Sequence, residues 1–106
     1  MRPGGLFDDL PGNLSRDAAR DLLSILKDSQ RDWGPMVARK TRDRLVRRCK
    51  DIADGWSYGH KRPDVPTRYA VLFVAEPPFI IAYAPETRQV LRILHGARDF
   101  TKIFPA

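Results

Sequence analysis

The chain has 106 residues, of which 42% are apolar and 30% are charged, and its formal net charge is +6. This length suits one compact domain over residues 1–106, and the composition is that of a folded chain and excludes disorder. The longest apolar run, residues 69–75, is far shorter than the ~20 residues of a membrane helix, and we expect no export signal. One cysteine and two histidines predict no disulfide and no structural zinc, which suits a cytoplasmic protein.

The positive charge is concentrated in one stretch of the sequence. Residues 35–68 hold ten Lys or Arg and four Asp or Glu, whereas the rest of the chain is balanced. Such a stretch predicts a surface that meets an acidic partner, which is either a nucleic acid or an acidic protein segment. Composition does not choose between them.

The first half of the chain predicts a helical hairpin over residues 15–54, after an irregular arm, or at most a short strand, in residues 1–14. Ser15 is a favourable cap for a first helix. Gly34 and Pro35 then predict a stop and a restart, which makes the two helices antiparallel. The apolar stripe of this first helix consists of Ala18, Leu22, Ile25, Leu26 and Trp33.

The second helix is predicted over residues 35–54, with Gly55 as its terminator. Its inner stripe consists of Ala38, Thr41, Leu45, Cys49 and Ile52. The other side carries the cations Lys40, Arg44, Arg47 and Arg48. Residues 56–67 contain Gly and Pro turns without a period, and we interpret them as an exposed loop.

The second half of the chain predicts an antiparallel meander within residues 68–95, from apolar runs at 69–74, 79–84 and 89–94. Residues 96–106 form a tail with a short helical turn. The fold class is therefore α+β, with the hairpin packed on a small antiparallel sheet. Both sheet faces are apolar, so the second face must be covered by a partner or by the chain ends. We expect a partner strand or helix there, and a free protein that is poorly soluble or self-associates.

Two motifs resemble the RelE/ParE superfamily of type II toxins. One is Arg68-Tyr69-Ala70-Val71-Leu72-Phe73, and the other is Leu94-His95-Gly96-Ala97-Arg98-Asp99, which is closer to the ParE, or plasmid-stabilisation, branch. The resemblance covers residues 15–104, and the family's first strand could come only from residues 6–14. It implies a toxin neutralised by the wrapping carboxy-terminal segment of a cognate antitoxin, in a higher-order complex.

The superfamily implies two different activities. RelE-type members are ribosome-dependent ribonucleases, and the corresponding cations here are Lys61, Arg68 and Arg98, with His95 as the base. At the position of the important RelE tyrosine stands Phe104, which has no proton to exchange. We therefore favour a ParE-like toxin that binds and poisons DNA gyrase without an active site of its own. Its expected target-binding residues are Arg92, His95, Arg98 and Phe104.

Each of these residues also has an ordinary structural interpretation. His95 ends an apolar strand, where a lone histidine is commonly a hydrogen-bonding residue. Arg68 and Arg98 can form ion pairs with Asp64 and Asp99. A third functional possibility is a toxin-fold protein that has lost its toxicity and serves as a binding partner.

The basic side of the second helix has three interpretations: a solvated face, a nucleic-acid contact, or a docking surface for an acidic antitoxin segment. We rank the antitoxin above nucleic acid, since no recognition-helix fingerprint and no aromatic stacking platform accompany the cations. The expected antitoxin-binding residues are thus Lys40, Arg44, Arg47 and Arg48. Cys49 lies on the inner stripe and is expected in the core. Nucleotide-binding loops and metal-ligand spacings are absent, which predicts no cofactor.

Overall fold

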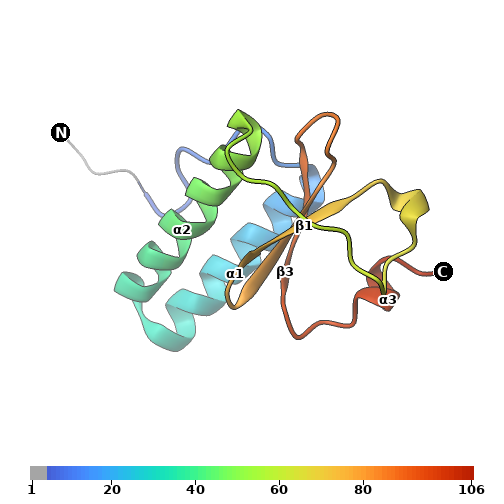
Figure 1. The fold of residues 1–106 in the computed structure, drawn as a ribbon. Helices are drawn as coiled ribbons and strands as arrows, with labels where there is room; N and C mark the ends of the chain where they lie inside the picture. Colours follow the sequence, from blue (N-terminus) through green and yellow to red (C-terminus); the bar gives the residue numbers. More distant parts are fainter. Residues whose placement is uncertain (1–4) are drawn as a thin grey trace.

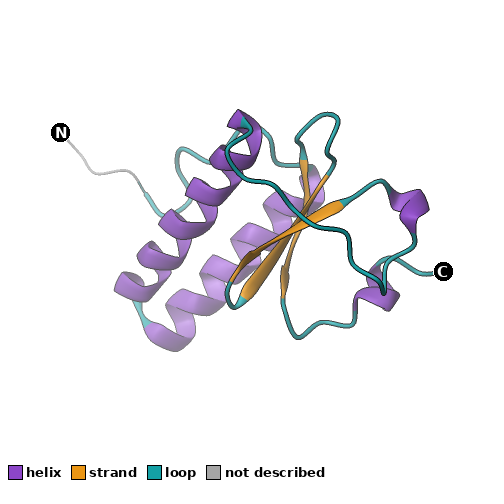
Figure 2. Ribbon diagram, viewed as in Figure 1, coloured by secondary structure: helices purple, strands orange, loops and turns teal. Residues whose placement is uncertain are grey.

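The computed structural model describes residues 5–106 and shows a helical hairpin followed by a three-stranded antiparallel sheet (Figure 1). In chain order the elements are α1 (Arg16–Trp33), α2 (Pro35–Asp54), the 3-10 turn η1 (Thr67–Tyr69), β1 (Leu72–Glu76), β2 (Phe79–Tyr83), β3 (Val90–His95) and α3 (Phe100–Ile103). Figure 2 shows α1 and α2 on one side of the sheet, and η1 and α3 on the other. The predicted α+β fold is confirmed. No helix within residues 5–106 is long and apolar enough to cross a membrane.

The two long helices begin and end where local sequence signals predict. The hydroxyl of Ser15 accepts a hydrogen bond from the amide of Ala18 at 3.0 Å, which caps α1. Gly34 ends α1 with a φ of 89°, a conformation that other residues rarely adopt. Pro35 then starts α2 without losing a hydrogen bond, and Gly55 ends α2 in the left-handed region.

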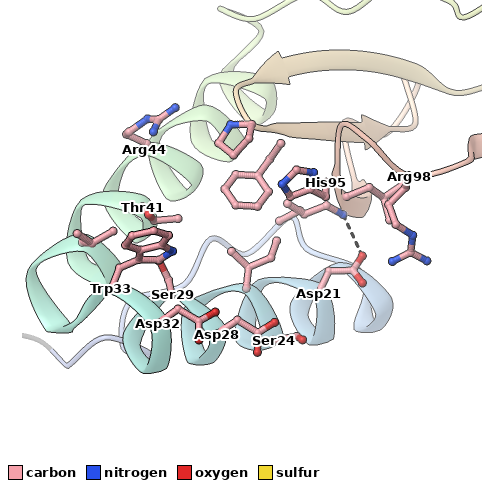
Figure 3. Close-up of a pocket in the computed structure, with 16 residues that line it drawn as sticks. Asp21, Ser24, Asp28, Ser29, Asp32, Trp33, Thr41, Arg44, His95 and Arg98 are labelled. Carbon is pink, nitrogen blue, oxygen red and sulfur yellow. Dashed lines mark hydrogen bonds between the residues drawn. The ribbon is translucent and has the colours of Figure 1, made fainter.

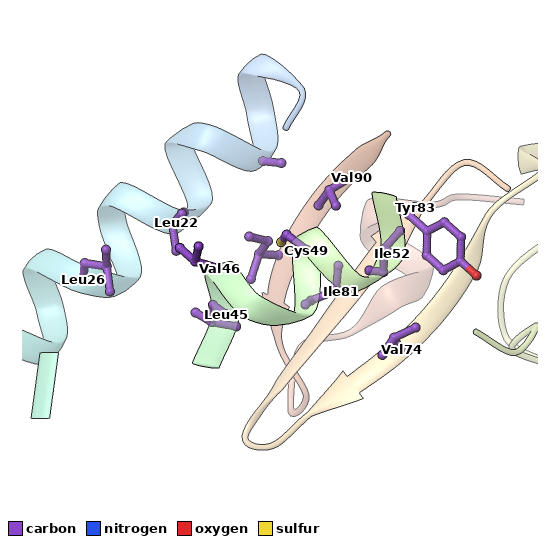
Figure 4. Close-up of a cluster of buried hydrophobic side chains, with 12 residues drawn as sticks. Leu22, Leu26, Leu45, Val46, Cys49, Ile52, Val74, Ile81, Tyr83 and Val90 are labelled. Carbon is purple, nitrogen blue, oxygen red and sulfur yellow. The ribbon is translucent and has the colours of Figure 1, made fainter. Parts of the chain in front are cut away.

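The first hydrophobic core fills the space between the hairpin and one face of the sheet (Figure 4). Its fully buried side chains include Leu22 and Leu26 of α1, Leu45, Cys49 and Ile52 of α2, and Ile81 and Val90 of the sheet. The inner stripes of both helices are thereby largely confirmed. Burial raises the pKa of the Cys49 thiol to about 12, because the thiolate would lose its hydration in this core.

Trp33 corrects the predicted stripe of α1, because its side chain is 74% exposed. The helices of the hairpin have 18 and 20 residues, whereas the strands have five or six. At 1.5 Å per helical residue and about 3.3 Å per strand residue, each helix is longer than the strands on which the hairpin packs. The last turn of α1 therefore extends past the end of the sheet, and no strand within residues 5–106 covers the Trp33 side chain.

The second face of the sheet is covered by the chain itself. A second core gathers side chains from the loop before β1, from the sheet and from the tail: Val65, Val71, Phe73, Ala82, Leu94, Phe100 and Phe104. The carboxy-terminal tail and the loop before β1 therefore provide the cover that this face needs. The expectation of a partner strand or helix on this face is thus wrong, and with it goes the reason to expect self-association.

Two side chains near η1 fasten the carboxy-terminal tail over this second core. The Arg68 guanidinium and the Tyr69 hydroxyl both donate hydrogen bonds to the carbonyl of Pro105, each at 2.6 Å. The Phe104 ring packs edge-on against Tyr69 and Phe73, with ring centroids 5.2 and 5.7 Å apart. The start of the tail is anchored by Phe100, which is 1% exposed and stacks on Phe73 with ring centroids 5.7 Å apart.

The first strand starts later than the apolar run 69–74 predicts. Residues 67–69 form η1, and the amide of Ala70 donates to the carbonyl of Thr67. Ala70 has a φ of 46°, which turns the chain before β1 begins at Leu72. The prediction failed because an apolar run does not reveal a 3-10 turn that uses its first residues.

The amino-terminal arm contributes one bridge to the sheet. Leu14 pairs in parallel with Val90 at the outer edge of β3. The amide of Val90 donates to the carbonyl of Asn13 at 2.7 Å, and the amide of Ser15 donates to the carbonyl of Val90 at 2.8 Å. Among residues 5–14 the arm is otherwise irregular, and its first four residues lie outside the described part of the chain.

Candidate functional site

A groove of about 610 Å³ lies between the hairpin and the end of the sheet where β2 starts and β3 ends (Figure 3). Its apolar lining includes Ile25, Trp33, Val37 and Phe79. Carboxylates of α1 line one wall, while Arg44 and Arg98 lie at separate ends in Figure 3. The groove is therefore apolar inside and charged at its rim.

His95 lies at the exposed end of β3 and lines this groove. Its ring packs edge-on against Phe79, with centroids 5.8 Å apart. The amide of Ala97 donates to its Nδ1 at a long 3.4 Å, which leaves Nε2 without a hydrogen bond to any residue in 5–106. His95 is thus oriented by its neighbours and still open to a partner.

Arg98 is exposed beside His95, and its guanidinium forms no ion pair with residues 5–106. The expected partner, Asp99, instead caps α3 and accepts hydrogen bonds from the hydroxyl and the amide of Thr101. These bonds lower the pKa of the Asp99 carboxyl below its usual range, the hydroxyl contributing most. The predicted ion pair between Arg98 and Asp99 is wrong, and Arg98 keeps its charge available.

The Arg92 side chain is bound to another residue of the chain. Its guanidinium donates to both carboxylate oxygens of Asp21, at 2.7 and 3.1 Å, and the amide of Ile93 donates to the same carboxylate at 2.9 Å. Hydrogen bonding to Asp21 raises the pKa of Arg92 further above its usual value. This arrangement fixes α1 to β3, so a target would have to compete with Asp21 for Arg92.

The four residues of the ribonuclease interpretation do not share a cavity. His95 and Arg98 line the groove, whereas Lys61 lines a separate cavity of about 270 Å³ beside η1. Arg68 is bonded to the tail and does not pair with Asp64, which Arg62 holds at 2.9 Å. The predicted pair between Arg68 and Asp64 is therefore wrong.

Phe104, a predicted target-binding residue, is only 8% exposed. Its ring lies in the second core, between Tyr69 and Phe73. Within the described chain its role is packing, and a partner would reach it only if the tail moved.

The cations on the outer side of α2 divide into two pairs. Arg44 and Arg48 both bind the carboxylate of Glu76 at the end of β1, at 2.9 and 3.2 Å. They therefore fasten α2 to the sheet, and one carboxylate leaves this cluster with a net positive charge. Lys40 and Arg47 are exposed and form no ion pair with residues 5–106.

Sequence reasoning missed several exposed apolar side chains. Trp56 and Tyr58, in the segment after α2, are 82% and 79% exposed. Met36 and Val37 join Trp33 at the tip of the hairpin. Aromatic residues that follow Gly55 in a loop without a period were a usable signal for the first pair.

Comparison with known proteins identifies the family. A family model described as the ParE toxin of the type II toxin-antitoxin system, parDE, matches residues 13–100. No curated protein matches the chain. The matched range holds the hairpin, the sheet and the groove, and it ends at the first residue of α3. The chain therefore belongs to the ParE toxin family of type II toxin-antitoxin systems.

Proposed function

We propose that this toxin arrests growth by binding DNA gyrase through the exposed end of β3, where Arg98 and His95 meet the groove. The observation that carries the proposal is the state of these two side chains: both are exposed, and neither has a strong partner within residues 5–106. Arg92, which lies on the same strand, is used by Asp21. An unpaired guanidinium at the rim of an apolar groove is a favourable contact for a protein partner.

Binding without catalysis agrees with the distribution of the cations. A ribonuclease needs an acid, a base and cations around one phosphate. Here Lys61, Arg68 and Arg98 are spread over two cavities and a tail contact. Phe104 offers no proton in place of a tyrosine.

We further propose that a cognate antitoxin neutralises the toxin by covering the groove. Trp33 and Val37 are exposed at its hairpin end, where an apolar face of a partner helix would bury them. Lys40 and Arg47 lie four residues before and three residues after Arg44, so the three cations are neighbours on the surface of α2. An acidic antitoxin segment that leaves the groove past Arg44 would meet all of them.

The two parts of the proposal can be tested separately. We expect Arg98→Ala to lose inhibition of DNA supercoiling by purified gyrase and to keep antitoxin binding. Arg47→Ala removes an equally unpaired arginine on α2 and is the matched control, which should inhibit gyrase fully. Full inhibition by Arg98→Ala would remove this residue from the target site.

The antitoxin surface is tested by affinity measurements on the purified pair. Val37→Asp places a charge on the apolar end of the groove, and we expect it to weaken antitoxin binding strongly. Arg47→Glu should weaken binding less and in a salt-dependent way, because its contact is an exposed charge pair. Unchanged affinity in Val37→Asp would place the antitoxin elsewhere on the toxin.

A further inference from the structure

Two aromatic side chains after α2 stand out from the rest of the surface. Trp56 and Tyr58 are the most exposed large apolar side chains within residues 5–106, at 82% and 79%. Neither lines the groove where we place gyrase and the antitoxin. Exposed aromatic rings of this size carry a free-energy cost in water that a binding partner would remove.

The backbone that carries these rings is held from inside. Ser57, which lies between them, is buried, and its hydroxyl accepts a hydrogen bond from Arg48 at 3.0 Å. The amides of Trp56 and Ser57 both donate to the carbonyl of Asp51, at 2.8 and 3.2 Å. The two rings are therefore presented from a fixed support.

The same support continues to the sheet. The amide of Gly59 donates to the Tyr83 hydroxyl at 2.9 Å. A side chain at Gly59 would come within 2.9 Å of the backbone of Phe73, so only glycine fits there. His60 then pairs with Phe73 by two backbone hydrogen bonds of 2.9 Å at the outer edge of β1.

The segment alternates like a strand at the sheet edge, which Figure 1 shows passing beside β1. Ser57 is buried, whereas Trp56, Tyr58 and His60 are exposed. Alternate side chains of an extended chain lie about 7 Å apart. The surface thus offers a row of flat rings on a preorganised backbone, which lowers the entropic cost of binding.

Cations lie beside the segment that carries these rings. The Arg88 guanidinium lies against Gly55, within about 3 Å of where a side chain there would begin, and Arg48 lies behind Ser57. Lys61 follows His60 and is exposed. Residues 48–62 hold four Lys or Arg, of which Arg48 is paired with Glu76 and Arg62 with Asp64. The cations here without an ion pair to residues 5–106 are Lys50, Lys61 and Arg88, against the two acids Asp51 and Asp54 in the last turn of α2. The net charge around the rings is positive.

Positive charge and spaced aromatic faces together fit one class of ligand. A helix of a protein partner would need a continuous apolar stripe, whereas these rings are separated by the buried Ser57 and bordered by cations. Unpaired bases offer flat faces joined by phosphates, and proteins bind them by stacking on aromatic rings beside basic residues. A base pair inside a duplex offers no free face to stack on.

We infer that Trp56 and Tyr58, with the cations that flank them, form a stacking site for the unpaired bases of a single-stranded nucleic acid. The site is separate from the gyrase and antitoxin surfaces and does not depend on them. The ligand class includes single-stranded DNA and RNA, because stacking uses the base faces that both share.

The chain provides its own fluorescent control for this site. Trp33 is also exposed, at 74%, and α2, which separates it from Trp56, is about 30 Å long. In the Trp33→Phe protein, an oligothymidylate of about 12 nucleotides at low salt should quench the emission of Trp56, since stacked bases quench indole. In the Trp56→Phe protein, the emission of Trp33 should not change.

Affinities are then measured by fluorescence anisotropy with labelled oligonucleotides. Trp56→Ala and Tyr58→Ala should each weaken binding roughly 5- to 100-fold, the range found for removal of one stacking ring. Trp33→Ala should change affinity by no more than about twofold, as a surface substitution outside the site. Lys61→Ala should reduce the salt dependence of binding.

Comparison of single-stranded DNA, single-stranded RNA and duplex DNA separates the possible ligands and can overturn the inference. Preference for oligothymidylate over oligouridylate would assign the site to DNA, and the reverse preference would assign it to RNA. Duplex DNA should bind more weakly than either. Absence of binding to both single strands at low salt would overturn the inference. So would equal losses in Trp33→Ala and Trp56→Ala, or single-strand binding that Trp56→Ala leaves unchanged.

Discussion

The two faces of the sheet are covered in different ways. On the hairpin side, two long helices bury side chains such as Leu45 and Ile81 completely. On the other side, a loop, η1 and the tail cover the sheet, and there Phe100 is buried while Phe73 and Phe104 keep 6% and 8% of their surface exposed. The helices form many backbone hydrogen bonds of their own. The loop and the tail are instead held mainly by side-chain contacts, such as the hydrogen bonds from Arg68 and Tyr69 to Pro105. We infer that the hairpin side sets global stability and that the tail side opens locally first.

The largest effect is expected on the hairpin side. Leu45→Ala should lower the free energy of unfolding by about 3 kcal/mol, because a cavity remains between rigid elements. Urea denaturation followed by circular dichroism measures this loss. A change below about 1 kcal/mol would mean that this face is packed no better than the tail side.

Phe104→Ala tests the tail side with a larger side chain. We expect a loss of only about 2 kcal/mol, since the tail can collapse into the space that the ring leaves. Hydrogen exchange should accelerate at the amide of Phe104, which bonds to the carbonyl of Phe100, before it changes in α1. Equal acceleration in both regions would show one cooperative unit and no weaker face.

Arg68→Ala removes one of the two side chains that bind the backbone of the tail. It removes the hydrogen bond to Pro105 and leaves the bond from Tyr69 in place. The expected loss is about 0.5 to 1 kcal/mol, the usual value for one exposed hydrogen bond. Faster exchange in α3 without a shift in the main unfolding transition is the predicted pattern, and a large global loss would contradict it.

The smallest effect concerns Asp99, which caps α3. The pKa of its carboxyl is lowered in the folded protein, mainly by the Thr101 hydroxyl. Its contribution to stability is therefore complete above the unfolded value near ~3.9 and is lost as the pH falls through the lower folded value. Thr101→Val should move the pKa of Asp99 back toward its usual range, which a carbon-detected NMR titration measures. An unchanged titration midpoint would refute the assigned cause.

The same division explains what the sequence could predict. Helix caps at Ser15 and Gly34 and the stripe of α2 depend on near neighbours along the chain, and they were predicted correctly. The Arg92 contact to Asp21 joins residues 71 positions apart, which no local pattern reveals. This contact occupies the guanidinium of Arg92, which the sequence predicted to bind the target.

Other failures arose from the chain's tertiary arrangement. The sequence required a cover for the second sheet face and did not say which segment provides it. Trp33 fits the helical period, yet the strands are too short to cover it. The exposure of Trp56 and Tyr58 depends on the inward anchors at Ser57 and Gly59, which only the fold brings against Arg48 and Phe73.

The most direct test of the central claim is induction of the toxin in cells without an antitoxin, with DNA breaks and messenger RNA integrity scored together over the first minutes. We predict DNA damage with intact transcripts for the natural chain and for Arg47→Ala, and neither effect for Arg98→Ala. Early transcript cleavage with intact DNA would contradict the gyrase proposal and would direct attention to His95 as a catalytic base. Growth without either lesion would indicate a toxin fold that has lost its toxicity.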